Sequence, residues 1–341
     1  MVEAPLVSVV IPCYNHGRFL GDALASVGTP DVRTEIIVID DGSTDSTPEV
    51  VATFETSNDF RSVRQGNAGL AAARNRGLRE SHGRYVIFLD ADDRLAPGAV
   101  DIGAGQLDEH PECAFTFGRC KMMDESGTLT ITSEQPRIVR DHYRELLRRN
   151  YIWMPAMVAF RREALERIGG FNKDVDASAD YEMYLRIARH HPVHDHAQVV
   201  AHYRKHAANM SGSAGRMLRE TLAVMRSQRP FLEGDEASLA AYEEGWRKWQ
   251  TYYGDELAAE IGSAAHEFRW AEAAVKAMIL GRYHPRGLWR HAVRKTQSAL
   301  RAASMSAGAS VPVDGGYAGR AIPVGESSAP TTRPSSSPGK R

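Results

Sequence analysis

The sequence has few cysteines, no long apolar run and almost no net charge, and each absence excludes a class of protein. Cys13, Cys113 and Cys120 are odd in number and lack metal-ligand spacing, which predicts no disulfide framework and a reducing, cytoplasmic location. The formal net charge of −1 gives no reason to expect nucleic acid as a partner. No stretch approaches the roughly 18 consecutive apolar residues of a membrane span. The N-terminal residues also lack the basic and apolar regions of a secretory signal.

The composition that remains suits a chain with a large core. Of the 341 residues, 43% are hydrophobic and 25% are charged, which is ordinary for a soluble globular protein. The length allows one large α/β domain with a helical appendage, or two modest domains.

Apolar, β-branched runs at residues 7–11, 35–39 and 85–89 predict three strands. These runs show no polar alternation, so they fit a parallel sheet that is covered on both faces. Pro12 has no N–H to continue a ladder, and we expect it to end the first strand.

Helices are expected between these strands, at residues 19–27, from Pro48 after a cap at Ser46 or Thr47, and at residues 69–80. The resulting order of strands and helices predicts an α/β fold with a doubly wound, Rossmann-like sheet. In such a sheet, ligands bind beyond the carboxyl ends of the strands.

Beyond residue 100 the pattern of predicted elements changes twice, first to mixed strands and helices and then to helices alone. Residues 115–123 and 153–160 predict strands, residues 161–168 and 180–190 predict helices, and residues 216–300 are mainly helical.

The expected domain organisation follows from these changes. We expect an α/β domain over residues 1–211, with a donor half at about 1–100 and an acceptor half at about 101–211. A C-terminal helical extension is expected over 212–303. Residues 304–341 are rich in Ser, Pro, Gly and Thr and are predicted to be disordered.

Acidic clusters follow two of the predicted strands: Asp40 with Asp41, and Asp90 with Asp92 and Asp93. In a parallel sheet both clusters lie at the same edge, where the carboxylates repel one another unless a cation neutralises them. A Mg²⁺ or Mn²⁺ ion that shares a diphosphate would relieve this repulsion. The alternative is that these residues only form turns and cap helices.

Four segments in order resemble the family 2 glycosyltransferases: VSVVIPCYN at 7–15, IVIDDGSTD at 37–45, NAGLAAARN at 67–75 and FLDADD at 88–93. The resemblance runs from about residue 6 to 211. It implies a GT-A fold and an inverting transfer of a sugar from a nucleotide diphosphate donor.

The resemblance also implies donor-binding residues. Tyr14 would face a uracil ring, and Asp41, rather than Asp40, would accept a hydrogen bond from the N3–H of the base. Pro12 stands where some relatives have a hydroxyl residue, so one uracil contact is absent. The remaining residues of the implied donor site are Asn15, Asn67, Gly69, Arg74, Asp90 and Asp92.

Within that set, Arg74 would reach the diphosphate; the alternative is a solvated helix arginine. Asp93 and Asp92 would form the metal motif for Mn²⁺ or Mg²⁺, with Asp93 as the direct ligand. His206 lies in a segment, YRKH at 203–206, that resembles the family's donor loop. It would complete the metal shell or touch the diphosphate, or else be a solvated loop histidine.

Asp180 is the candidate base for the acceptor. Inverting transfer needs a carboxylate that takes the proton of the attacking hydroxyl, and the segment GGFN at 169–172 with ADYEMYLR at 179–186 resembles the acceptor-side motif. Asp180 could equally cap the following helix, and both roles are compatible. Glu182 is the second candidate, which the helix would turn away from the site.

Two features of the helical end have open alternatives. Apolar and basic residues interleave over residues 282–301, which fits an interfacial helix in peripheral contact with the anionic inner face of a membrane. The alternative is a terminal helix that packs Trp289 on the domain. Aromatic residues near 250 form the core or frame an acceptor. The residues concerned are Arg282, Arg286, Arg290, Arg294, Lys295 and Arg301, and Trp246, Trp249, Tyr252 and Tyr253.

The function expected from these features is an inverting hexosyltransferase, dependent on a divalent metal. Its donor would be a UDP-sugar. The acceptor would be a hydroxyl of a glycan, a lipid-linked molecule or a small molecule, as in polysaccharide biosynthesis. Two alternatives are a sugar-nucleotide nucleotidyltransferase and an inactive module that binds a nucleotide sugar. The first usually has a glycine-rich basic loop after the first strand, which residues 12–17 do not form.

Overall fold

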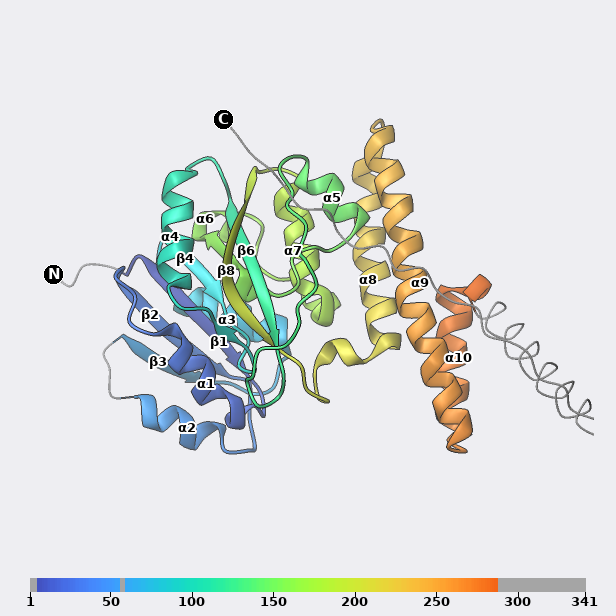
Figure 1. Ribbon diagram of the computed structural model, residues 1–341, viewed down its shortest axis with the longest axis horizontal. Helices are drawn as coiled ribbons and strands as arrows, with labels where there is room; N and C mark the ends of the chain where they lie inside the picture. The colour runs from blue at the N-terminus through green and yellow to red at the C-terminus, as the bar shows by residue number, and fades with distance from the viewer. Residues whose placement is uncertain (1–4, 56–58, 288–341) are drawn as a thin grey trace, which may run out of the picture. The chain divides into compact units, whose positions relative to one another are not determined.

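An eight-stranded mixed sheet forms the centre of the protein in the computed structural model, which describes residues 5–55 and 59–287 (Figure 1). The strand order is β3-β2-β1-β4-β7-β6-β8-β5. The four strands β3, β2, β1 and β4 are parallel to one another. Strand β7 is antiparallel to both of its neighbours, β4 and β6, and β5 is antiparallel to β8. The strands are β1 (Val7–Cys13), β2 (Thr34–Asp40), β3 (Phe60–Arg64), β4 (Tyr85–Phe88), β5 (Arg94–Leu95), β6 (Phe115–Met123), β7 (Val158–Arg161) and β8 (Val193–Arg204).

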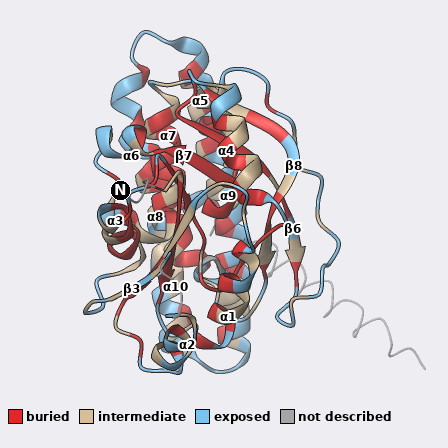
Figure 2. Ribbon diagram, turned by 90° about the vertical axis from the view of Figure 1, so that its left-hand side faces the viewer, coloured by how far each residue is buried: buried red, intermediate tan, exposed pale blue. Residues whose placement is uncertain are grey.

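The central strands are covered on both faces, as their unbroken apolar sequences predict. All residues of β1 and β4 are buried. Because successive side chains point to opposite faces of a sheet, complete burial means that both faces are packed. Figure 2 shows the same concentration of buried residues along the sheet.

The prediction that Pro12 ends the first strand is wrong, because β1 continues to Cys13. Cys13 faces β2 and its carbonyl accepts from the N–H of Asp41 at 2.8 Å, whereas Val10 faces β4 and accepts from Leu89. Backbone groups alternate between the two sides, so Pro12 faces the β4 side, where pairing has already ended. Its missing N–H therefore costs no ladder hydrogen bond.

Two other strand predictions differ from the structure. Strand β3 was not expected, since its sequence has no apolar run; it is an edge strand that pairs with β2 alone and has no fully buried residue. Residues 153–160 are only partly a strand, because Pro155–Met157 form a 3-10 turn ahead of β7. Proline is a favoured start for such a turn.

Four helices follow the strands of the first half: α1 (Gly17–Val27), α2 (Thr47–Phe54), α3 (Leu70–Glu80) and α4 (Ala99–Glu109). The cap of α2 differs from the prediction. Neither Ser46 nor Thr47 caps it with a side chain; Asp45 accepts from the N–H of Thr47 at 3.0 Å instead.

The acceptor half adds three helices, α5 (His142–Arg148), α6 (Arg162–Arg167) and α7 (Ala179–Ala188). Helices α6 and α7 start and end close to the predicted positions, whereas α5 was not expected. Three longer helices follow: α8 (Ala214–Gln228), α9 (Glu236–His266) and α10 (Trp270–Tyr283). A second apolar cluster joins them, with Leu218, Leu257 and Leu280 completely buried. No helix within residues 5–55 or 59–287 combines the length and the apolar character needed to cross a bilayer.

Three of the four aromatic residues singled out on α9 pack within the protein, and none of the four lines the cavity described below. Tyr253 is buried, and Trp246 and Trp249 pack against both apolar clusters, while Tyr252 is exposed. The boundary expected at residues 211 and 212 stays a prediction. The predicted tail at 304–341 and most of the basic segment, including Trp289, lie outside the described residues.

The docking of α9 on the α/β part gives a test of the fold. A Cβ at Gly245 would penetrate the backbone carbonyl of Leu147, at the end of α5. We expect Gly245→Ala to lower the free energy of unfolding by about 1–3 kcal/mol, the usual cost of overpacking against atoms that cannot move. Gly105→Ala in α4 is the matched control, since nothing lies within 4 Å of its Cβ. Equal urea midpoints for the two variants would contradict this packing.

Candidate functional site

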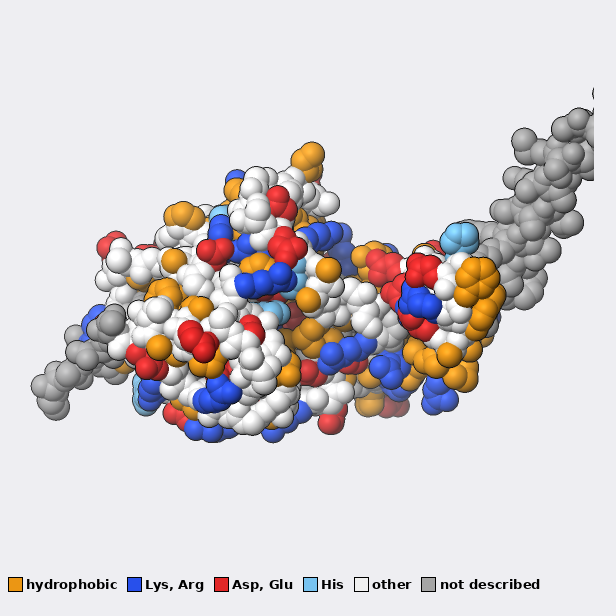
Figure 3. Space-filling view, turned by 90° about the horizontal axis from the view of Figure 1, so that it is seen from below, with side chains coloured by type: hydrophobic (Ala, Val, Ile, Leu, Met, Phe, Trp, Pro, Cys, Tyr) orange, Lys and Arg blue, Asp and Glu red, His pale blue; other side chains and the backbone are white. Residues whose placement is uncertain are grey.

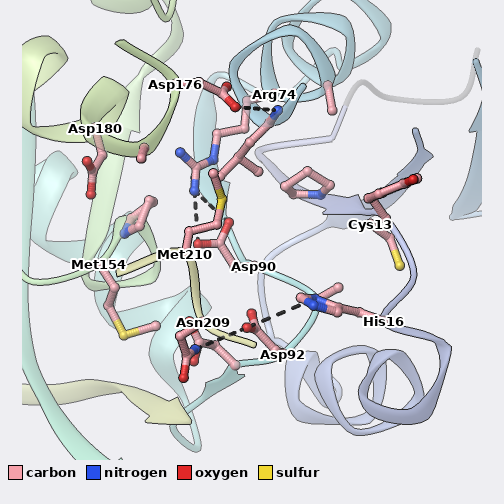
Figure 4. A pocket seen from close by; sticks show the side chains of 18 of the residues that line it. Cys13, His16, Arg74, Asp90, Asp92, Met154, Asp176, Asp180, Asn209 and Met210 are labelled. Atoms are coloured by element: carbon pink, nitrogen blue, oxygen red, sulfur yellow. Dashed lines mark hydrogen bonds and ion pairs between the residues drawn. The ribbon is translucent and has the colours of Figure 1, made fainter. Parts of the chain in front are cut away.

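A cavity of about 470 Å³ opens at the carboxyl ends of β1, β2 and β4, where the sequence predicts the ligand site. In the close view of Figure 4, Asp180 and Met154 lie on one side, His16 and Cys13 lie on the other, and the pair of Arg74 and Asp90 lies between them. The predicted residues that line the cavity are Pro12, Tyr14, Asp41, Asn67, Gly69, Arg74, Asp90, Asp92, Asp93 and Asp180.

Tyr14 and Asp41 are the two lining residues that were predicted to contact the base. Tyr14 is 47% exposed, so its ring is free to meet a planar ligand. Asp41 is buried, and its Oδ1 accepts from Gln65 Nε2 and the N–H of Ala68, while its Oδ2 accepts from the N–H of Gly69. A carboxylate has about four acceptor positions, so Asp41 keeps one for a ligand donor.

Asn15 differs from the other residues predicted to bind the donor, which line the cavity. It has a positive φ of 55°, and its side chain oxygen accepts from the N–H of Thr44 at 2.8 Å. It does not line the cavity but joins the end of β1 to the turn after β2. Its conformation is one that asparagine adopts more readily than most residues.

Arg74 is buried and donates to both carboxylate oxygens of Asp90, at 2.6 and 2.9 Å. It is therefore not a solvated helix arginine. Its Nε is buried without a hydrogen-bond partner among the described groups. Such an unpaired buried donor is costly, and it leaves Arg74 with capacity for an acceptor from a ligand.

Asp92, rather than Asp93, lies beside His206. The imidazole Nε2 of His206 is 2.8 Å from Asp92 Oδ2, and His16 Nδ1 is 4.0 Å from the same oxygen. Ligand atoms of these three side chains all lie within 4.8 Å of one another. His206 does not line the cavity itself, but its side chain is fully buried against Asp92.

Asp93 points away from this trio and into the protein. It is buried, and its Oδ1 accepts from the N–H of Arg204 at 2.7 Å. Burial raises the pKa of Asp93 well above its usual range, and the negative charges of Asp92 and Asp90 raise it further. The site thus has an excess of negative charge that a cation would relieve.

The residues present fit a divalent cation. One carboxylate and two imidazoles converge at Asp92, and two more carboxylates lie close by. Mg²⁺ takes oxygen ligands almost exclusively, whereas Mn²⁺ also accepts imidazole nitrogen. Asp92, His206 and His16 are the residues that could hold such an ion.

Asp180 lies in the cavity wall, in the first turn of α7. Its Oδ1 accepts from the N–H of Tyr181, and Ser178 occupies the cap position. Burial raises the pKa of Asp180 to about 6, against the lowering effect of Arg74. Glu182 is buried in an ion pair with Arg186 and does not line the cavity.

Sequence reasoning missed several residues of the cavity. Asp176 accepts from the N–H of Ala71 at 2.6 Å, so it satisfies the N-terminus of α3 from a segment about 105 positions away. His16 had a usable signal, since it follows Tyr14 and Asn15 at the end of a strand. Tyr203 of β8 lies in the segment that resembles the donor loop, but the resemblance implied no role for it. Other lining residues gave no signal, because they come from loops, from short 3-10 turns or, for Arg216, from the surface of α8: Trp153, Met154, Pro155, Ala177, Ala208, Asn209, Met210 and Arg216.

The buried guanidinium of Arg204 gives a test of what holds the acidic turn. It donates to the carbonyl oxygens of Asp92 and Glu125 and to Asp22. We expect Arg204→Lys to lose some of these hydrogen bonds and to lower the free energy of unfolding by about 1–3 kcal/mol, because an ammonium group cannot reproduce the bonds of the buried guanidinium to three acceptors.

The control is Arg18→Lys, in an ion pair with Glu125 whose two side chains are more than half exposed. Exposed pairs contribute about 0–1 kcal/mol, so its urea midpoint should barely change. An unchanged midpoint for Arg204→Lys would show that the turn does not depend on the guanidinium.

Comparison with known proteins finds a family match over the α/β part. Residues 8–169 match the family model described as Glycosyl transferase family 2. TuaG of Bacillus subtilis (strain 168), a protein assigned as a teichuronic acid biosynthesis glycosyltransferase, is 35% identical over 127 residues, which cover 36% of this chain and 50% of TuaG. Chondroitin synthase of Escherichia coli is 27% identical over 189 residues, which cover 54% of this chain and 27% of the synthase. The chain thus spans half or less of each of these relatives.

Two solved structures resemble most of the chain in fold. The S. aureus TarS fragment 1–349 in complex with UDP-GlcNAc has a TM-score of 0.55 at 18% identity, with 71% of this chain and 70% of that chain covered. Mannosyltransferase PcManGT from Pyrobaculum calidifontis, in complex with GDP-Man and Mn²⁺, has a TM-score of 0.55 at 21% identity, with 86% and 87% covered. At these identities the likeness concerns the fold, and it confirms the predicted GT-A class.

Proposed function

We propose that this chain, whose residues 8–169 match glycosyl transferase family 2, is an inverting, metal-dependent glycosyltransferase. Its donor is a nucleotide diphosphate sugar, with UDP as the nucleotide, and its acceptor is a hydroxyl group. One observation carries the proposal: a single cavity joins an ionisable carboxylate, Asp180, to the cation-binding trio around Asp92. The same cavity offers Tyr14 and Asp41 to a base.

On the donor side, Tyr14 stacks on the base and the free acceptor position of Asp41 Oδ2 receives its N3–H. The exposed Asn67 and the positive φ of Gly69 let the backbone approach the ligand closely. Arg74 contributes positive charge to the diphosphate site, and its Nε has no hydrogen-bond partner among the described groups. TarS and PcManGT, whose structures contain UDP-GlcNAc and GDP-Man, support a nucleotide sugar in this fold.

Asp92, His206 and His16 hold the divalent ion, and Asp93 orients the turn from behind. Bound there, Mn²⁺ supplies Lewis-acid stabilisation of the diphosphate leaving group. The two imidazoles favour Mn²⁺ over Mg²⁺.

Asp180 takes the proton from the acceptor hydroxyl as its oxygen attacks the anomeric carbon from the side opposite the diphosphate. The bond between that carbon and the diphosphate oxygen breaks, the leaving nucleotide takes the electron pair, and the configuration inverts. A base must be ionised before it can act, and a pKa of about 6 keeps Asp180 ionised near neutral pH while it remains basic enough to accept a proton.

The metal assignment can be tested by binding alone. We expect Asp92→Asn to weaken Mn²⁺ binding at least about tenfold, as the loss of a group that orients or binds a metal does. Titration of Mn²⁺ by electron paramagnetic resonance, with and without UDP, measures this without turnover. Asp255→Asn, on the exposed side of α9, should bind Mn²⁺ as the wild type does. Equal affinity for Asp92→Asn and the wild type would remove Asp92 from the site.

The base assignment predicts a separate effect on turnover. We expect Asp180→Asn to lower kcat by about 10²–10⁴, the scale for loss of a general base, with UDP affinity nearly unchanged. The assay is release of nucleoside diphosphate from a panel of UDP- and GDP-sugars with Mn²⁺. Wild-type kcat should rise with pH through about 6 and level off above it, because only the ionised carboxylate accepts a proton.

Glu182→Gln is the control, since Glu182 pairs with Arg186 outside the cavity. The acidic limb of the pH profile should persist in that variant and disappear in Asp180→Asn. A small change of kcat in Asp180→Asn would contradict its role as base. Donor binding without turnover across the panel would instead favour the inactive binding module.

A further inference from the structure

Helix α10 is apolar on a face that the described residues leave uncovered. Its buried side packs in the second apolar cluster through Leu280, with the partly buried Ile279 and Tyr283 beside it. Elsewhere on the same helix, Trp270, Val275 and Met278 are 63%, 52% and 67% exposed. A helix of a soluble protein usually has a polar outer face, so this one calls for a partner.

Phe268, in the turn before α10, extends this surface. It is 79% exposed, and its ring centroid is 6.4 Å from that of Trp270. We name Phe268, Trp270, Val275 and Met278 the α10 patch. Figure 3 shows hydrophobic side chains gathered at the end of the molecule formed by α9 and α10.

A row of exposed residues leads along α10 from the patch to an arginine. Residues four apart lie on the same helix face, and Trp270, Ala274, Met278 and Arg282 follow at this spacing, all exposed. Arg286, beyond the end of the helix at Tyr283, is also exposed. Among residues 5–55 and 59–287, no carboxylate forms an ion pair with Arg282 or Arg286.

The acidic residues near the patch form ion pairs. Glu267 and Glu272 both pair with Arg269, and Glu260 and Glu272 pair with Lys276, so three carboxylates share two cations. Arg282 and Arg286 remain as two further positive charges, and between Glu272 and Asp314 the sequence has seven Lys and Arg residues and no Asp or Glu. Positive charge therefore prevails in the sequence from α10 onward.

We propose that the α10 patch docks on an anionic lipid surface. Aromatic and aliphatic side chains next to arginines suit the boundary between headgroups and acyl chains, where each part finds its own environment. A second copy of this chain would bring the same positive charge and repel it. The inference is independent of the proposed catalysis, because the patch lies outside the cavity.

Co-sedimentation of the full chain with vesicles tests this. We expect binding to phosphatidylcholine vesicles that contain phosphatidylglycerol, and little binding to phosphatidylcholine alone. The double variant Trp270→Gln with Met278→Gln should bind at least about tenfold more weakly, because it loses the apolar contact. Arg282→Gln with Arg286→Gln should also weaken binding. Higher salt should weaken wild-type binding as the Debye length falls from about 10 Å at 0.1 M to about 3 Å at 1 M.

Ile131→Gln is the matched control, since Ile131 is an exposed apolar residue far along the chain from α10. It should bind vesicles as the wild type does, and all variants should keep wild-type UDP and Mn²⁺ affinity. Three results would overturn the proposal: no binding to anionic vesicles at low salt, a dimer in light scattering that the Trp270 and Met278 variant abolishes, or a lower melting temperature for that variant. The last two would show that protein, not lipid, covers the patch.

Discussion

A single buried cation, the guanidinium of Arg204, ties together the parts of the chain that create the acidic end of the cavity. It connects the end of β8 to the carbonyl oxygen of Asp92 and to Asp22 on α1, and the backbone N–H of the same residue donates to Asp93. The Arg204 side chain is only 1% exposed, so its N–H groups depend on these protein acceptors rather than on water. The direction in which Asp92 points, and with it the trio with His206 and His16, follows from this network.

The aspartates of the cavity differ in their charge state and hydrogen bonding because their neighbours differ. Asp90, Asp92, Asp93 and Asp180 are all aspartates within one site, but each has a different partner. Asp90 is paired with buried Arg74, Asp93 receives a backbone N–H in the interior, and Asp92 meets imidazoles. Asp180 forms no ion pair within the described part of the chain, and burial raises its pKa to about 6. These environments are the basis for the different roles that we propose for the four aspartates.

The helical part is built into the same site rather than appended to it. Arg216 of α8 lines the cavity and pairs with Asp176, which in turn satisfies the N-terminus of α3. Helix α9 reaches the α/β part through the close approach at Gly245. The outer face of α10 is different, because it contributes nothing to the cavity and exposes apolar side chains.

The sequence by itself determined the layered part of the fold and most of the cavity lining. Unbroken β-branched runs place β1, β2 and β4 in a parallel sheet, and the carboxyl ends of parallel strands meet at one edge, so Asp41, Asp90 and Asp92 had to converge. Only the tertiary structure decided which of Asp92 and Asp93 faces the histidines, because alternation along a chain does not reveal where a buried arginine will stand. It also decided that β3 pairs at the edge and that Asp176, Trp153 and Arg216 join the site. Asp176 and Trp153 lie in segments without periodicity, and Arg216 lies on a helix whose docking partner the sequence does not reveal. Packing between segments far apart in the chain sets all three positions.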